Sequence, residues 1–218
     1  PRSEGARRPP HAQARPRRGA IPLETAAFES TVEYRSQVDL AEKHRIAGGA
    51  TELLHGGAET VYLDEGFTPR LIAERLADQE LTVVTSSLLA AEALAHSETV
   101  TVLLLGGRMR GRTLATVDHW ATDMLGGLVI DVAFLGTNGI SPEHGLTTPD
   151  PPAVAAVKHT AVKVARRRIL VAAHTKFGVS SFCRFADVSD FDSIVTGTEL
   201  SLTEARRYET LGPSVVRT

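Results

Sequence analysis

The chain contains only four lysines, Lys43, Lys158, Lys163 and Lys176, beside twenty arginines. Lys176 stands just past a predicted strand, and Lys158 stands on a helix predicted after the loop 145–150. A lysine ammonium is a compact point charge that can hold an anionic oxygen. We therefore interpret Lys176 as a candidate anion ligand. For Lys158, a solvated surface position is an equal alternative.

Small and polar residues follow four predicted strands directly. The segments are 64–66 (Asp-Glu-Gly), 85–87 (Thr-Ser-Ser), 106–108 (Gly-Gly-Arg) and 136–139 (Gly-Thr-Asn-Gly). In a parallel α/β sheet, ligands bind beyond the carboxyl ends of the strands. Four strand ends of one type predict a shared pocket, and ordinary turn chemistry at four separate turns is the alternative.

The first of these strand ends could cradle an anion. Backbone N–H groups at Gly66, and at a helix start capped by Thr68, are suited to bind one. Asp64 would suit a hydrogen bond to a sugar hydroxyl, whereas Glu65 would repel a phosphate group unless its side chain turns outward.

Other side chains near these turns have less specific interpretations. Arg108 and Arg110 could add positive charge to the pocket, although exposed arginines are common. Trp120 and Phe134 are expected to pack in the core rather than to stack on a ligand. His174 is expected to be a turn residue rather than a ligand contact.

Several classes of site are excluded by motif. The chain has no GxxxxGKS/T loop, no GxGxxG opening a helix, no GxSxG elbow and no HExxH. The single cysteine, Cys183, rules out an internal disulfide framework and a cysteine-rich zinc site. We therefore expect no metal ion and no cofactor.

Composition and charge separate the start of the chain from the rest. Hydrophobic residues make up 42% of the chain, as in globular proteins, but residues 1–20 hold six arginines, one glutamate and four prolines. This segment is expected to be a disordered linker, or else an arm near a nucleic-acid-binding element. Because this segment is strongly basic while the whole chain has a net charge of −2, the remaining body is acidic. An acidic body is a poor platform for nucleic acid. No apolar run of about 20 residues and no signal-peptide core occur, so we expect a cytoplasmic protein without a membrane span.

Strand and helix signals alternate along the body. The predicted helices are 36–54, 69–77, 88–95, 117–125, 153–165 and 202–211, and the predicted strands are 61–63, 81–85, 100–105, 130–135, 169–173, 193–196 and 215–216. Short apolar strands separated by helices predict an α/β fold, with a mainly parallel sheet covered by helices on both faces.

An ordered series of segments resembles the C-terminal effector-binding domain of DeoR-family bacterial transcriptional regulators. The segments are 18–22 (Arg-Gly-Ala-Ile-Pro), 41–47, 61–66, 81–87, 103–108, 133–140, 145–150, 155–158 and 174–178. The resemblance implies a sugar-phosphate sensor whose fold is similar to ribose-5-phosphate isomerases and CoA transferases. It also implies that residues 1–20 are a linker, that 21–218 form the sensor domain, and that the winged helix-turn-helix of the family is absent from this chain.

The departures from the family pattern fall at its ligand loops. The usual Asp-Ser-Gly-Thr-Thr loop reads Asp-Glu-Gly-Phe-Thr at 64–68, and the usual Thr-Asn-Ser reads Thr-Ser-Ser at 85–87. Residues that are usually acidic are here Val154, Ala173 and Asn138. The loss of acceptors for sugar hydroxyls predicts that the scaffold is kept while the ligand has changed.

Three functions remain open at this point. The first is a sensor of carbohydrate metabolism, in which a phosphorylated sugar or related metabolite alters operator binding by a homo-oligomer that contacts DNA only through the missing domain. The second is an isomerase-like enzyme, which would need a carboxylate base; Asn138 stands where the resembling segment would offer that acid, which leaves Asp64 as the remaining candidate. The third is a ligand-free dimerisation domain. We expect the sensor, not an enzyme, with these ligand residues: Asp64, Gly66, Thr68, Thr85, Ser87, Gly106, Gly107, Arg108, Gly136, Asn138, Gly139, Lys158 and Lys176.

Overall fold

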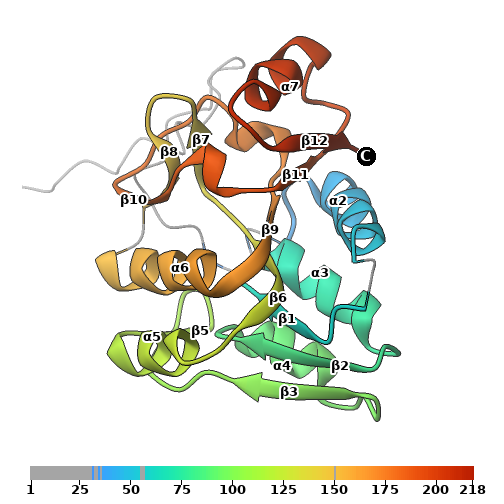
Figure 1. Ribbon diagram of the computed structural model, residues 1–218, viewed down its shortest axis with the longest axis vertical. Coiled ribbons are helices and arrows are strands. Elements are labelled where there is room, and N and C mark those ends of the chain that lie inside the picture. The colour runs from blue at the N-terminus through green and yellow to red at the C-terminus, as the bar shows by residue number, and fades with distance from the viewer. Residues whose placement is uncertain (1–30, 32–33, 35, 55–56, 150) are drawn as a thin grey trace, which may run out of the picture.

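Seven parallel strands form the central sheet of the computed structural model (Figure 1). Their spatial order is β12-β11-β9-β6-β1-β2-β3. The strands are β1 (Thr60–Leu63), β2 (Leu81–Thr85), β3 (Val100–Leu104), β6 (Ile130–Leu135), β9 (Ala165–Val171), β11 (Ser193–Thr196) and β12 (Ser214–Arg217). The structure describes residues 31, 34, 36–54, 57–149 and 151–218. The predicted linker 1–20 and its boundary with the sensor domain lie outside the described residues.

Helices cover both faces of this sheet, as the continuous apolar strands require. The helices α2 (Leu40–Glu52), α3 (Phe67–Leu76) and α4 (Leu88–Leu94) pack on one face; α5 (His119–Gly126), α6 (Pro152–Val164) and α7 (Leu202–Glu209) pack on the other. Alternation along β1 shows the two layers, because Val61 and Leu63 pack with Ile72 of α3 while Tyr62 packs with Leu125 of α5. None of the helices in the described residues is long and apolar enough to cross a membrane. The predicted α/β fold with a mainly parallel sheet is confirmed.

Two small antiparallel sheets were not predicted from the sequence. One pairs β4 (Arg108–Arg110) with β5 (Ala115–Val117), and the other has the order β10-β8-β7, with β7 (Gly139–Ser141), β8 (Gly145–Thr148) and β10 (Cys183–Ala186). These strands are three or four residues long, too short for an alternating pattern to emerge.

Three predicted helix starts were wrong by a few residues. Gly66, not Thr68, is the N-cap of α3, and its φ of 126° suits a residue without a Cβ. The helix predicted from 117 begins at His119, because Val117 pairs with Arg108 in the β4–β5 ladder. The helix predicted from 36 begins at Leu40, after Asp39 with a φ of 52°.

The strand order reverses next to β1. From β1 the chain winds to β2 and then β3, whereas β6 pairs with the opposite edge of β1, with Leu63 beside Phe134. The loops that follow β1 and β6 therefore leave the sheet in different directions. In open α/β sheets such a switch point is where ligands bind.

Candidate anion-binding site

A cleft opens at this switch point, beyond the carboxyl ends of β1, β6 and β9. Its empty volume, including the open mouth, is about 560 Å³. Its lining comes from α2, the β1–α3 loop, the β6–β7 loop, α6 and the segment after β9: Lys43, Glu65, Gly66, Phe67, Thr68, Pro69, Gly136, Thr137, Asn138, Lys158, Val171, Ala172, Ala173 and Lys176.

The amino end of α3 forms one wall of the cleft. Phe67 and Thr68 begin this ten-residue helix, and no side chain caps it. The N–H groups of a first helical turn lack acceptors within the helix, and the helix dipole makes this end positive. Pro69 has no N–H group, so the donors left to face the cleft are those that precede it. This wall is suited to an anion.

Three of the four lysines of the chain line the same cleft. Lys43 comes from α2, Lys158 from α6, and Lys176 from the short 3-10 helix η1 (His174–Lys176). The Lys43 ammonium donates a hydrogen bond to the Val38 carbonyl at 2.6 Å. The fourth lysine, Lys163, is exposed in the last turn of α6.

Lys158 forms a buried ion pair with Asp64. Their side chains are 3% and 1% exposed, and Asp64 Oδ2 also accepts the backbone N–H of Gly136 at 3.0 Å. Burial raises the pKa of the Asp64 carboxyl above its ordinary value, and the Lys158 ammonium opposes that shift. The pair ties the loop after β1 to the loop after β6. The surface alternative for Lys158 is therefore wrong, and Asp64 Oδ2 is engaged by protein groups rather than open to a sugar hydroxyl.

A second, very small hollow lies beside the ion pair. Ser86, Thr116 and Val154 line it together with Asp64 and Lys158. Asp64 Oδ1, the oxygen that does not bind Lys158, is buried without a hydrogen-bond partner in the described residues. Val154, which stands where the resembling family is usually acidic, therefore leaves an apolar wall beside a carboxylate oxygen.

The two departures in the β1–α3 loop face the cleft. Glu65 is only 6% exposed, so its carboxylate does not turn out to solvent. Phe67 offers its ring to the cleft and to the Arg70 guanidinium, which lies 5.8 Å from the ring centroid. A ligand in this cleft meets a carboxylate and an aromatic ring as well as lysines.

The structure brings six of the thirteen predicted ligand residues to the cleft: Gly66, Thr68, Gly136, Asn138, Lys158 and Lys176. Thr85 and Ser87 are fully buried, and their side chains form hydrogen bonds with backbone groups instead. Thr85 Oγ1 donates to the Leu63 carbonyl at 2.7 Å, and Ser87 Oγ accepts the N–H of Ala90 as the N-cap of α4. Gly139 lies in β7, against the backbone of Val179.

The predicted residues after β3 lie elsewhere. Gly107 and Arg108 line a separate hollow with Trp120, and Arg108 pairs with Asp118 at 2.8 Å. Gly106 lies beside Met124 of α5. The single pocket predicted from four strand ends is therefore wrong in extent, because β2 and β3 lie on the far side of β1 from β6 and β9.

Two expectations about aromatic side chains had opposite outcomes. Phe134 is completely buried in the core, as predicted, whereas Trp120 is 65% exposed on α5. Lys43 lines the cleft although its position there was not predicted. The small number of lysines in the chain was a signal that could have pointed to Lys43. Its place at the cleft depends on how α2 packs on the sheet, which the local sequence does not show.

Parts of two solved structures align with this chain. A structure of a RipA variant aligns over 81% of this chain and 51% of its own, with 15% identity and a TM-score of 0.50. Ribose 5-phosphate isomerase A of Methanocaldococcus jannaschii aligns over 62% of this chain and 53% of its own, with 16% identity and a TM-score of 0.44.

Curated relatives are named as transcriptional regulators. The uncharacterized HTH-type regulator FruR of Bacillus subtilis is 34% identical over 182 residues, 83% of this chain and 71% of its own. The glycerol-3-phosphate regulon repressor of Escherichia coli is 27% identical over 179 residues, 82% of this chain and 70% of its own. Residues 38–198 match the family described as the DeoR C terminal sensor domain. The chain therefore belongs to the DeoR family of transcriptional regulators and contains the sensor domain of that family.

Proposed function

We propose that the cleft binds a phosphorylated sugar or a related phosphorylated metabolite, with the phosphate group between Lys43, Lys176 and the amino end of α3. The observation that carries the proposal is the lining of one cleft at the switch point by three of only four lysines, beside an uncapped helix start. A relative named as a glycerol-3-phosphate regulon repressor supports the phosphorylated class.

Both signs of charge line the cleft. Lys43 and Lys176 bring ammonium groups to it, Glu65 brings a carboxylate, and the ammonium of Lys158 is paired with Asp64. Hydrogen bonds to charged groups contribute about 1.5–3 kcal/mol each. Glu65 accepts hydrogen bonds and is placed to select a ligand with a hydroxyl or amino donor near its phosphate group.

The protein acts as a sensor rather than as an enzyme. Asn138 lines the cleft at the position where the resembling family segment has an acid, and an amide cannot take a proton. The effector acts by binding one arrangement of the regulator more tightly than another, which changes operator binding through the DNA-binding domain of the full regulator. We also propose that the regulator is a homo-oligomer, since paired DNA-binding domains read paired half-sites.

A thermal-shift panel tests this function. Glycerol 3-phosphate, fructose 1-phosphate and ribose 5-phosphate are each compared with the unphosphorylated parent, with inorganic phosphate as a further probe. A ligand at one hundred times its dissociation constant adds about 2.7 kcal/mol to the unfolding free energy, so a rise in Tm is expected for at least one phosphorylated compound.

Matched lysine variants locate the binding. Lys176→Ala is expected to reduce the shift, whereas Lys163→Ala, an exposed position outside the cleft, is expected to keep it. Equal stabilisation by the phosphorylated and unphosphorylated members of a pair would contradict the proposal. No shift with any compound would favour a ligand-free dimerisation domain.

A further inference from the structure

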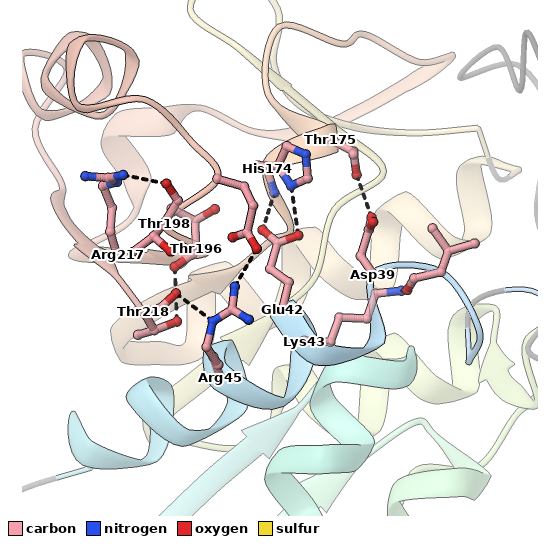
Figure 2. Close-up of polar contacts among 12 residues, drawn as sticks. Asp39, Glu42, Lys43, Arg45, His174, Thr175, Thr196, Thr198, Arg217 and Thr218 are labelled. Carbon is pink, nitrogen blue, oxygen red and sulfur yellow. Dashed lines mark hydrogen bonds and ion pairs between the residues drawn. The ribbon is translucent and has the colours of Figure 1, made fainter. Parts of the chain in front are cut away.

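The start of α2 holds the loop that follows β9 (Figure 2). Glu42 is 4% exposed; its Oε1 accepts the backbone N–H of His174 at 2.7 Å, and its Oε2 lies 2.8 Å from Nδ1 of the same histidine. Thr175 Oγ1 donates to Asp39 Oδ2 at 3.1 Å. Two successive residues of the loop are therefore fastened to two residues at the start of one helix.

These two segments also carry the cleft lysines. Lys43 directly follows Glu42, and Lys176 stands two residues after His174. Successive residues of an α-helix point about 100° apart, so α2 can hold the loop with one side chain and present the next to the cleft. The contacts of Glu42 thus set the position of Lys176 relative to Lys43.

A second carboxylate lies beside Glu42 but is held differently. Glu199 pairs with Arg45 at 2.6 Å. Arg45 Nε also donates to the Thr218 carbonyl at 3.1 Å (Figure 2). A Cβ at Gly197 would collide with both carboxylates, so the absence of a side chain there makes room for them. Glu199 therefore belongs to the same cluster and forms its ion pair with α2 rather than with the loop.

We propose that Glu42 is a positioning residue for the effector site. It fixes the loop 172–178 against α2, so that Lys176 and Lys43 are set at one spacing before the phosphate group arrives. Preorganised charges bind more tightly because their ordering cost is met on folding. The inference rests on the proposed function of the cleft, and it predicts that Glu42 affects affinity through Lys176 without touching the ligand.

A double-mutant cycle tests the proposal. The affinity for inorganic phosphate and for the tightest phosphorylated compound of the panel is measured by calorimetry in the wild type, Glu42→Gln, Lys176→Ala and the double variant. Loss of the charged hydrogen bonds at His174 is expected to weaken binding about tenfold in Glu42→Gln. In the Lys176→Ala background the same change is expected to have almost no further effect. Glu199→Gln is the matched control and should bind within about twofold of the wild type.

Each outcome has a distinct meaning. Full additivity of the two losses, or unchanged binding by Glu42→Gln, would overturn the positioning role while leaving the cleft intact. If the wild type binds no phosphorylated probe, the proposed function itself fails. If Glu42→Gln does not fold, His174→Ala replaces it, because this half-buried side chain can be removed while the backbone contact to Glu42 remains. A cycle with no coupling for His174→Ala would equally overturn the proposal.

Discussion

At the scale of single residues, the main feature of the cleft is a buried ion pair between Lys158 and Asp64. Lys158 and Asp64 are both buried, and each is expensive to bury without the other. Lys158 also donates to the Gly136 carbonyl at 3.3 Å, so one ammonium reaches both loops at the switch point. The pair therefore connects the two loops that line the cleft.

This ion pair predicts a strong energetic coupling between Asp64 and Lys158. Asp64→Asn leaves a buried ammonium without its counter-ion and is expected to lower the unfolding free energy by about 3 kcal/mol, while Asp64→Asn combined with Lys158→Met should lose less than the sum of the single losses. Urea unfolding followed by circular dichroism measures all four proteins. Strictly additive losses would show that the two charges do not stabilise one another.

Residue type alone pointed to part of the lining of the candidate cleft. The rarity of lysine and the glycines after β1 and β6 pointed to Lys158, Lys176, Gly66 and Gly136. The same reasoning failed for Thr85, because a small hydroxyl at a strand end serves a backbone bond as readily as a ligand.

At the scale of elements, the Asp131 carboxylate joins the amino ends of three neighbouring strands. Asp131, at the start of β6, accepts hydrogen bonds from the backbone N–H groups of Glu59 and Thr60 at 3.1 Å and from Thr60 Oγ1 at 2.9 Å. It also pairs with Arg166 of β9. These bonds, chiefly the one from the Thr60 hydroxyl, lower the pKa of Asp131. Three neighbouring strands are thus joined at the end of the sheet opposite the cleft.

This contact predicts a pH dependence of stability. Because the pKa of Asp131 is lower in the folded than in the unfolded chain, its contribution is present above about pH 4 and is lost as the pH falls through the folded value. At pH 7, Asp131→Asn is expected to be about 1–2 kcal/mol less stable than the wild type, and the gap should shrink toward pH 2. Chemical denaturation at both pH values measures it. A gap that is constant or widens on acidification would contradict the argument, and phosphate affinity at pH 7 should not change.

The regular elements could be predicted from sequence and the short ones could not. Each of the seven parallel strands has a core of apolar or β-branched residues between helical segments, which is a local signal. The β4–β5 and β7–β8 pairs are local hairpins, but their strands are only three or four residues long, too short for an alternating pattern to emerge. Strand β10 depends on pairing with a distant segment, Cys183 with Thr148, which is a tertiary property.

At the scale of the whole molecule, the cleft joins the two helical layers. Lys43 comes from α2, which packs on one face of the sheet, and Lys158 comes from α6 on the other (Figure 1). A ligand that bridges them can favour one arrangement of the layers over another, which is what a sensor requires. The sheet order places these residues together, and no local pattern contains that order.

The surface of the molecule offers a site for the predicted homo-oligomer. Apolar side chains are exposed on the edge strand β3, on β4 and on α5, namely Leu103, Leu104, Met109, Trp120 and Met124. An uncovered apolar edge strand is uncommon in a soluble monomer. Assembly remains a prediction, which light scattering coupled to size-exclusion chromatography measures directly.

The most direct test of the central claim uses the four lysines as reporters. With lysine labelled at 13Cε, a 1H–13C spectrum contains one signal for each of Lys43, Lys158, Lys163 and Lys176, assigned by single Lys→Arg variants. Adding the tightest phosphorylated compound of the panel should shift the signals of Lys43 and Lys176 and leave that of Lys163 unchanged. Binding that leaves the Lys43 and Lys176 signals in place, or that moves Lys163 as much as either, would contradict a phosphate site in this cleft.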